Sequence, residues 1–390
     1  MGSSKKINMK VCVVIPHFYP HVGGAEQGLM NLVLEYVKKG MKVRVITAKD
    51  DFEGDYQNYK GIDIYYYDWK MLFGHPLARK KDLKEHILWA DVVHSLVYSV
   101  VPATTHLCRK YKKPHICMVH EVLRNKWFWV EKNIIKALIF RMYEKYIVMQ
   151  KPDLFICPST ATLNDLKKTN KKCNAKRVFC ISEFEIKDFK ENKKKFYDYF
   201  GVTKDDRVFL NYGRPGKTKG LFVYLDAIKM IAKEMNKKDL KNIKFCFIMG
   251  NDPISERNRF LKEVKENNLE NNVIVKESVS RDDLDNYRMC ADYIVVPSIT
   301  EGFGLTAIEA CEFKKNVILS NGGSLPEVAY GSVLYFENRN SNDLADKLKS
   351  VILNKAKFEN KEKKDFSKET ISKEYIDIYK KVIKEKEKEK

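Results

Sequence analysis

Two carboxylates flank a glycine-rich turn in the second half of the chain, within the sequence SITEGFGLTAIEA at residues 298–310. Glu301 and Glu309 stand eight positions apart, and Gly302 and Gly304 lie between them. Glycine lets a backbone approach a ligand closely. Ionised carboxylates accept hydrogen bonds from hydroxyl groups, including those of a sugar. The turn therefore holds groups that suit a ligand rich in hydroxyls.

The residues on either side predict how this turn is positioned. The apolar run at residues 293–297 predicts a buried parallel strand, and residues 306–313 predict a helix. Glu301 then lies in a strand-to-helix loop, and Glu309 lies inside the helix. Because a helix start presents free N–H groups to an anion, a phosphate fits beside the two carboxylates. This combination predicts a nucleotide-sugar site, and hence an enzyme.

A second loop, GRPGKTKG at residues 213–220, also follows an apolar strand and opens a helix. Arg214 offers a planar fork of donors for two phosphate oxygens, and Lys219 adds a point charge near the helix start. Together they would neutralise a diphosphate without a metal. The alternative is an ordinary surface turn rich in glycine and lysine. The spacing is not that of a P-loop.

Two candidate ligand-binding features of the first half lie in loops that follow predicted strands. Gly23 and Gly24 link the first strand to the first helix and would let the backbone approach a bound group. His120 directly follows the apolar run at residues 115–119, at a carboxyl strand end, where ligands of α/β proteins bind. The alternatives are a plain turn for the glycines and a structural role for the histidine.

Short apolar runs alternate with amphipathic stretches along the chain, which predicts βαβ units and parallel sheets. Residues 180–207 are polar, with no long apolar run, so we place a domain boundary there. The expected domains are residues 9–190 and residues 200–355. Strands are expected at 11–15, 42–46, 62–65, 92–94, 115–119, 154–157, 208–212, 245–249, 273–275, 293–297 and 317–319, and helices at 25–39, 219–235, 254–267, 281–290 and 306–313.

The end of the chain is rich in lysine and glutamate, but its apolar residues follow helical spacing. Residues 366–385 are therefore expected to form a docking helix, and residues 384–390 to be frayed. Asp283 and Asp285 form an Asp-x-Asp at a predicted helix start, which we interpret as capping and surface charge.

Composition narrows the class of protein. At 390 residues the chain suits two domains, and no apolar run reaches the length of a membrane span. Its nine cysteines include no C-x-x-C pair, which favours buried free thiols in a reducing cytoplasm. No secretory signal is recognised at the start. A cytoplasmic protein is expected.

Positive charge is concentrated in the first half. The net charge is +20, and residues 1–190 carry 33 Lys and Arg against 19 Asp and Glu. An excess in one half indicates an anionic partner, although a generally basic surface is an equal alternative. The aromatic cluster at residues 127–129 precedes an apolar and basic helix at 134–143, so it could contact lipid or an acceptor. Core packing is the alternative for this cluster.

The ordered set of loops resembles the family 4 glycosyltransferases, retaining enzymes of the GT-B fold, over nearly the whole chain. The matching motifs are GGAE at residues 23–26, G-R-x4-K-G at 213–220, E-x7-E at 301–309 and the glycine turn at 321–328. The resemblance implies two Rossmann-like doubly wound domains that face each other across a cleft, with the C-terminal helix returning to the first domain. Two segments depart from the pattern: SEFE at residues 182–185, and Glu121 where the family has aspartate.

The resemblance also implies a role for each site residue. Arg214 and Lys219 would bind the donor diphosphate, Glu309 the ribose hydroxyls, Glu301 the donor sugar, and His120 would lie beside the reacting sugar. The donor would further contact Gly23, Gly24, Gly302 and the backbone amides of Phe303, Gly304, Leu305 and Thr306. Catalysis would be of the hexosyltransferase type, with no metal or other cofactor.

The expected substrates are a UDP- or GDP-sugar and an acceptor that is lipid-linked or an anionic glycan. Such an acceptor would place the enzyme peripherally on an anionic membrane surface, at the cytoplasmic face. One alternative is a sugar-nucleotide epimerase of similar fold. A nucleic-acid-binding protein is a distant alternative, suggested by charge alone, because no RNP, helix-turn-helix or zinc pattern occurs.

Overall fold

The computed structural model describes residues 7–21, 23–50, 52–72, 74–96, 98–131, 133–182, 192–313 and 315–389. The chain divides into two compact units, and each contains its own sheet. Unit 1 comprises residues 1–183 and 365–390, and unit 2 comprises residues 184–364. Part of the expected boundary, residues 183–191, lies outside the described residues.

Unit 1 is built on an eight-stranded sheet in which only the edge strand β3 runs antiparallel to its neighbour. In sheet order the strands are β10 (Ala175–Arg177), β9 (Leu154–Cys157), β8 (His115–Met118), β7 (Val92–Leu96), β1 (Lys10–Val14), β2 (Lys42–Ala48), β4 (Ile62–Tyr67) and β3 (Tyr56–Tyr59). A small hairpin of β5 (Met71–Leu72) and β6 (His75–Pro76) stands apart from this sheet.

Alternate side chains of the central strand pack into different cores, so both faces of this sheet are covered. Val11 and Val13 join a cluster with residues of α1 and α15, whereas Cys12 and Val14 join a cluster with residues of α2 and α3. The helices of unit 1 are α1 (Gly24–Lys38), α2 (Lys80–Trp89), α3 (Val101–Lys110), α4 (Trp127–Val130), α5 (Ile134–Val148), α6 (Thr160–Thr169) and α15 (Lys368–Lys388), with short 3₁₀ turns η1 (Tyr98–Val100) and η2 (Arg124–Lys126).

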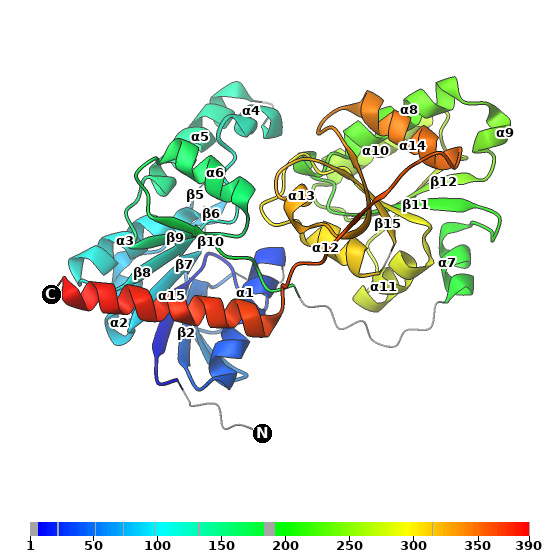
Figure 1. Cartoon of the computed structure of the whole chain (residues 1–390). Helices are drawn as coiled ribbons and strands as arrows, with labels where there is room; N and C mark the ends of the chain where they lie inside the picture. The colour runs from blue at the N-terminus through cyan, green and yellow to red at the C-terminus, as the bar shows by residue number, and fades with distance from the viewer. Residues whose placement is uncertain are drawn as a thin grey trace. The chain divides into compact units, whose positions relative to one another are not determined.

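The C-terminal helix α15 packs on α1 in unit 1, as Figure 1 shows in red and blue. The Tyr379 hydroxyl lies 3.1 Å from the Tyr36 hydroxyl and 2.7 Å from Nδ1 of His94, all of them buried. The expectation of a frayed end from residue 384 is wrong, because α15 continues to Lys388. Lys386 holds this last part through a 2.7 Å ion pair with Asp153.

Unit 2 has a seven-stranded sheet in which only the edge strand β17 is antiparallel to its neighbour. In sheet order the strands are β13 (Val273–Lys276), β12 (Ile243–Met249), β11 (Arg207–Gly213), β14 (Tyr293–Val296), β15 (Asn316–Ser320), β16 (Gly331–Phe336) and β17 (Glu359–Lys361). The helices are α7 (Lys193–Phe200), α8 (Leu221–Glu234), α9 (Lys237–Leu240), α10 (Ile254–Glu266), α11 (Arg281–Cys290), α12 (Leu305–Glu312), α13 (Leu325–Val328) and α14 (Ser341–Ile352), with the 3₁₀ turn η3 (Lys217–Lys219).

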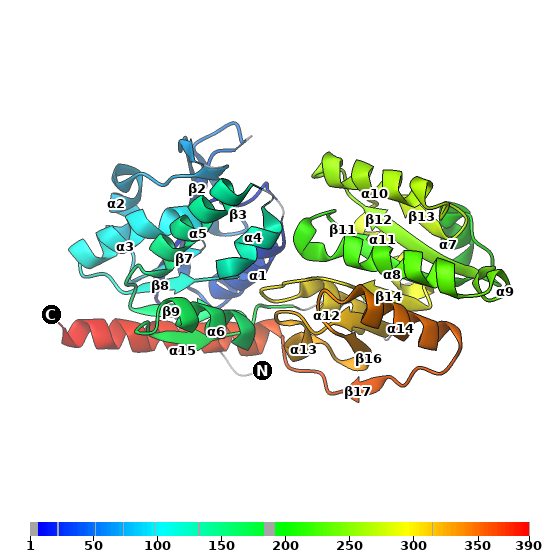
Figure 2. The ribbon, with the colours of Figure 1, turned by 90° about the horizontal axis from the view of Figure 1, so that it is seen from above.

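Aromatic and aliphatic side chains fill the core of unit 2 between the sheet and its helices. Phe209, Phe245 and Phe247 pack against residues of α8, α10 and α14. Helices α8 and α14 lie side by side, as Figure 2 shows. Helix α7 lies within the stretch that we expected to be a boundary, and its Phe196 is buried against Tyr287 of α11.

Candidate active site

The order of strands in unit 2 reverses between β11 and β14, two parallel strands that pair directly. In open α/β sheets, ligands bind outside the carboxyl ends of the strands at such a reversal. The loop after β11 contains Arg214 and Lys219, and the loop after β14 contains Glu301. The two loops that the sequence singled out therefore leave the same edge of the sheet as neighbours.

These two loops are locked together at the backbone. Gly220 has a φ of +67°, and a Cβ added there would lie 1.8 Å from the carbonyl oxygen of Pro297. The Ile299 N–H donates to the carbonyl of Thr218 at 2.7 Å. Only glycine can occupy position 220 without displacing one loop, so this contact fixes Lys219 relative to Glu301.

Lys219 and Glu301 meet directly across these loops. The Nζ of Lys219 lies 2.6 Å from Oε1 of Glu301, and the Ser298 hydroxyl donates to the same oxygen at 2.8 Å. The Glu301 side chain is 13% exposed and that of Lys219 31%, so both can be reached from solvent. A cation for phosphate and a carboxylate for hydroxyls thus lie within one hydrogen bond of each other.

The glycine turn after β15 contacts the backbone of Glu301. The Ser324 N–H and hydroxyl each donate to the carbonyl of Glu301, at 3.1 Å. Gly323 has a φ of +56°, and a Cβ there would lie 2.6 Å from the same carbonyl oxygen. The turn therefore holds the Glu301 backbone by contacts that a larger residue at position 323 would break.

Helix α12 begins directly after the same loop. Gly304 is its N-cap, with a φ of +88°, and offers no side-chain cap. The first N–H groups of a helix have no partner within the helix, and they carry the positive end of its dipole. The amides of Leu305 and Thr306 therefore form a start suited to an anion, after Gly302 and Phe303 in the loop.

Glu309 lies on α12 inside a network of arginines. Its Oε1 lies 2.9 Å from Nη1 of Arg281, and its Oε2 lies 2.5 Å from Nη2 of Arg288. Arg288 is 1% exposed and also binds Asp285 at 2.5 Å. The same guanidinium lies 4.3 Å from the ring of Tyr212.

This network corrects the interpretation of the Asp-x-Asp as capping and surface charge. The N-cap of α11 is Ser280, whose hydroxyl accepts from the Asp283 N–H. Asp283 pairs with Lys195, as expected of a surface charge. Asp285, however, pairs with the buried Arg288. Sequence reasoning missed Arg288; its signal was an arginine three residues after an aspartate on one helix face.

Arg214 differs from its neighbours because its side chain is exposed and has no ion-pair partner among the residues that the structure describes. It directly follows β11, so its position relative to the sheet edge is set by the strand. The guanidinium is available to a ligand without breaking an existing pair.

The remaining predicted residues belong to unit 1. Gly23 is the N-cap of α1 and Gly24 is its first residue, in the loop after β1. A Cβ at Gly23 would lie 2.3 Å from Oε2 of Glu26. His120 follows β8, which β7 separates from β1. Both features lie at carboxyl strand ends, as the sequence indicated, but two strand positions apart.

His120 is held in its neutral form. Burial lowers its pKa to about 4, so the imidazole is uncharged near pH 7. Its Nε2 is buried and makes no hydrogen bond to the residues described here. Its backbone carbonyl accepts from the Thr162 hydroxyl at 3.2 Å. A neutral ring nitrogen with unused hydrogen-bonding capacity is suited to a polar ligand.

Membrane-spanning helices, metal-binding clusters and disulfides can also be sought among the described residues. Over the described ranges, no helix is long and apolar enough to cross a membrane. The same residues contain no group of three or more His, Cys, Asp or Glu arranged for a metal ion. No disulfide joins the nine cysteines in the described part of the chain, and burial raises the pKa of Cys12, Cys117 and Cys180 to about 12, which keeps these thiols protonated near pH 7.

Two family models together match most of the chain. The model described as Glycosyltransferase Family 4 matches residues 22–184, and the model described as Glycosyl transferases group 1 matches residues 192–373. The second match contains both loops at the β11–β14 reversal. The first contains Gly23, Gly24 and His120.

Relatives and solved structures agree with these matches. An uncharacterized glycosyltransferase of Methanocaldococcus jannaschii is 24% identical and covers 95% of this chain and 98% of its own length. An alpha-monoglucosyldiacylglycerol synthase of Streptococcus pneumoniae is 24% identical over 77% of this chain and 69% of that protein. The structure of HepE from Anabaena in complex with UDP-glucose superposes with a TM-score of 0.67 at 15% identity, covering 98% of this chain and 99% of that one.

Proposed function

Because the chain belongs to the group 1 glycosyltransferases of family 4, with the GT-B fold, we propose that it transfers a sugar from a nucleoside diphosphate sugar to an acceptor with retention of configuration. Family membership confirms the predicted fold class and the prediction of a glycosyltransferase. The donor, the stereochemistry and the acceptor are the parts proposed here.

The observation that carries the proposal is the juxtaposition of Lys219 and Glu301 at the β11–β14 reversal. Arg214 and Lys219 supply two positive charges, and the start of α12 adds N–H donors, so a diphosphate has three sources of stabilisation. Glu301 then accepts hydrogen bonds from the sugar carried by that diphosphate. Glu309, held by Arg281 and Arg288, accepts from the ribose hydroxyls.

The proposed chemistry uses the leaving group itself. The acceptor hydroxyl attacks the anomeric carbon on the face that the diphosphate leaves, and a diphosphate oxygen takes the acceptor proton. The bond from anomeric carbon to diphosphate breaks while the new glycosidic bond forms, so the configuration is retained. The main catalytic contribution is electrostatic: Arg214, Lys219 and the α12 amides stabilise the negative charge that develops on the diphosphate.

This assignment gives the protein no metal requirement, because fixed cationic groups take the place of a divalent ion at the diphosphate. Burial keeps His120 neutral, and we assign it to the reacting sugar. There its imidazole can form a hydrogen bond with a sugar hydroxyl without adding charge. The family pattern also assigns a donor contact to the backbone at Gly23 and Gly24, in the loop after β1.

The proposed acceptor is lipid-linked. The streptococcal relative is named for a glucosyldiacylglycerol product, and the first half of this chain carries most of the excess positive charge. For the base, the complex of HepE with UDP-glucose makes UDP-sugars the first donors to examine. GDP- and ADP-sugars complete the comparison.

Thermal unfolding with UDP-, GDP- and ADP-sugars tests donor binding. One nucleotide sugar should raise Tm in the presence of EDTA, and Arg214→Ala should remove this shift. Incubation of that donor with a polyprenyl phosphate or diacylglycerol should give a glycosylated lipid, whose anomeric configuration NMR compares with that of the donor. Inversion, interconversion of the donor sugar without an acceptor, or a requirement for added metal would each contradict the corresponding part of the proposal.

A further inference from the structure

Exposed large hydrophobic side chains gather on one short segment of unit 1. Among the described residues, fifteen large apolar side chains are exposed, and nine of them lie between residues 128 and 149. Two are on α4, and seven follow on α5 and its C-cap. They are Phe128, Trp129, Ile134, Ile135, Leu138, Ile139, Met142, Tyr146 and Met149. We call these nine side chains the α4–α5 face.

Helix geometry places the α5 part of this face opposite the core. The inner side buries Ala137, Glu144, Ile147 and Val148. At 3.6 residues per turn, the exposed apolar residues fall within one sector of about 140° on the other side. Surface helices of globular proteins ordinarily present charged and polar residues there. Helix α5 is therefore apolar on both its packed and its outward sides.

Basic side chains border the α4–α5 face. Residues 124–149 contain six Lys or Arg and two Glu. Arg141 and Lys145 follow each other at helical spacing along one border of the apolar sector, and Lys136 lies beyond the other. Arg141 and Lys145 are exposed, and neither forms an ion pair with a residue that the structure describes.

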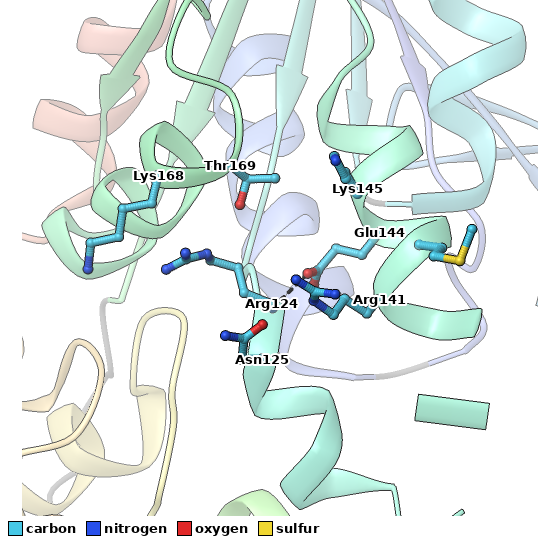
Figure 3. A pocket seen from close by; sticks show the side chains of 8 residues that line it. Arg124, Asn125, Arg141, Glu144, Lys145, Lys168 and Thr169 are labelled. Atoms are coloured by element: carbon cyan, nitrogen blue, oxygen red, sulfur yellow. Dashed lines mark hydrogen bonds between the residues drawn. The ribbon is translucent and has the colours of Figure 1, made fainter. Parts of the chain in front are cut away.

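A cavity of about 310 Å³ opens at the same border. Figure 3 shows the side chains that line it, which come from η2, α5 and α6. Four of the eight lining residues are cations: Arg124, Arg141, Lys145 and Lys168. Met142 lines the cavity and also belongs to the α4–α5 face, so the basic cavity and the apolar face are continuous.

Carboxylates lie close to two of these four cations: Asp165 pairs with Arg124 at 3.6 Å and with Lys168 at 3.7 Å, whereas Arg141 and Lys145 have no ion pair with a described residue. Glu144 is 3% exposed, and its two oxygens accept from the backbone N–H groups of Leu123 and Arg124, at 2.8 and 2.7 Å. Arg124 has a φ of +54°, an uncommon backbone conformation for a residue other than glycine, and its N–H is the one that donates to Glu144. Burial raises the pKa of Glu144, and these two hydrogen bonds offset only part of that increase.

We propose that the α4–α5 face docks on an anionic lipid bilayer, with a lipid phosphate seated in the basic cavity between η2, α5 and α6. Apolar side chains enter the boundary between headgroups and acyl chains, while Arg141 and Lys145 contact lipid phosphates. A second copy of this chain is the other candidate occupant. A symmetric contact would bring the two copies' basic borders together, so charge favours the anionic surface.

This inference deepens the proposed function, and rests on it only because a lipid-linked acceptor gives the contact its use. Sedimentation of the full-length protein with vesicles tests it. Phosphatidylcholine vesicles that contain roughly 35 mol% phosphatidylglycerol should bind the protein, and vesicles of phosphatidylcholine alone should bind it weakly. High salt should weaken the binding to anionic vesicles.

Two paired variants separate the charge from the apolar face. Arg141→Glu with Lys145→Glu, and Ile134→Ser with Ile135→Ser, should each lower vesicle affinity on the order of tenfold or more. The matched controls are Lys80→Glu with Lys84→Glu, an exposed pair of the same spacing on α2, and Met71→Ser with Leu88→Ser, both exposed. The controls should bind as the unchanged protein does. Unchanged Tm in each variant establishes that the fold is intact.

Three results would overturn the inference. One is equal binding by the α5 variants and their controls, and another is no binding of the unchanged protein at low salt. The third is a dimer in solution that Ile134→Ser with Ile135→Ser dissociates, without any vesicle binding. Donor-induced shifts in Tm are measured on the same samples. A protein that binds vesicles but no nucleotide sugar contradicts the proposed function alone, and the reverse pattern contradicts only the membrane contact.

Discussion

The Nζ of Lys219 lies 2.6 Å from Oε1 of Glu301, although the two residues are 82 positions apart. Lys219→Ala should therefore lower kcat/KM for transfer by at least about 10²-fold, because it removes a cation from the leaving diphosphate and a partner from Glu301. Arg214→Ala should have a similar effect without loss of stability, since its side chain is exposed.

Steady-state assays of kcat/KM for sugar transfer by both variants test this prediction. Lys237→Ala is the control, because it removes an exposed lysine on α9 of the same unit. Rates near those of the unchanged enzyme for both Lys219→Ala and Arg214→Ala would contradict the assignment of the diphosphate site.

Gly220→Ala should separate the two loops of the candidate site. A Cβ at this position meets the Pro297 carbonyl at 1.8 Å, whereas one at Gly201, which has nearly the same φ of +68°, meets nothing within 4 Å. Gly201→Ala should cost about 1 kcal/mol through its left-handed backbone alone. Gly220→Ala should cost about 1–3 kcal/mol more, because of the added clash. Urea unfolding measures the free energy of unfolding of both variants. An equal loss of stability in the two would show that the contact between position 220 and Pro297 does not hold the loops together.

Arg288→Ala should destabilise the protein by about 3–5 kcal/mol, because it leaves Asp285 and Glu309 without their buried partner. Arg288→Lys should recover part of this loss, since one ammonium can face only one of the two carboxylates well. Thermal or urea unfolding measures both variants. An Arg288→Ala protein as stable as the unchanged one would remove the structural role of this network.

Acidification should destabilise the protein between pH 6.5 and 4. Burial lowers the pKa of His94 and of His115 to about 3, so the folded form excludes protons that the unfolded chain binds below pH 6.5. The contribution of each histidine to the free energy of unfolding is therefore fully present above pH 6.5. Below that pH it falls by about 1.4 kcal/mol per pH unit until the pH reaches the pKa of the folded form. Unfolding midpoints at several pH values measure this slope.

His115→Gln should flatten the dependence on pH, whatever its effect at pH 7, because it removes one proton-binding group from the unfolded chain. His106→Gln is the control, since His106 is exposed on α3. The same slope in all three proteins would mean that His115 is protonated in the folded state.

Much of the fold followed from local patterns. Apolar runs such as residues 245–249 and 293–297 became central strands because a strand buried on both faces reads as a continuous apolar run. The edge strand β3, with the sequence YQNY, was missed because an edge strand is largely exposed and has no such run. The end of α15 was missed because Lys386 is fixed by Asp153, 233 positions away.

The candidate site was predictable to the level of its loops. The E-x7-E spacing and the Arg214–Gly220 motif identified the residues, and the order of strands explains why the loops meet. Arg288 was not predictable in its role, because its burial depends on Glu309 and Tyr212, which come from other elements. A buried charge of this kind is set by tertiary contacts that no local pattern records.

The return of α15 to unit 1 affects how the protein is made. Seven residues of this helix are buried, and most of them belong to the core that also contains β1 and α1. A ribosome makes these residues only after all of unit 2. The part of unit 1 that is synthesised first therefore cannot complete its core until α15 has been made, and termination of translation before residue 368 would leave its apolar surface open to aggregation.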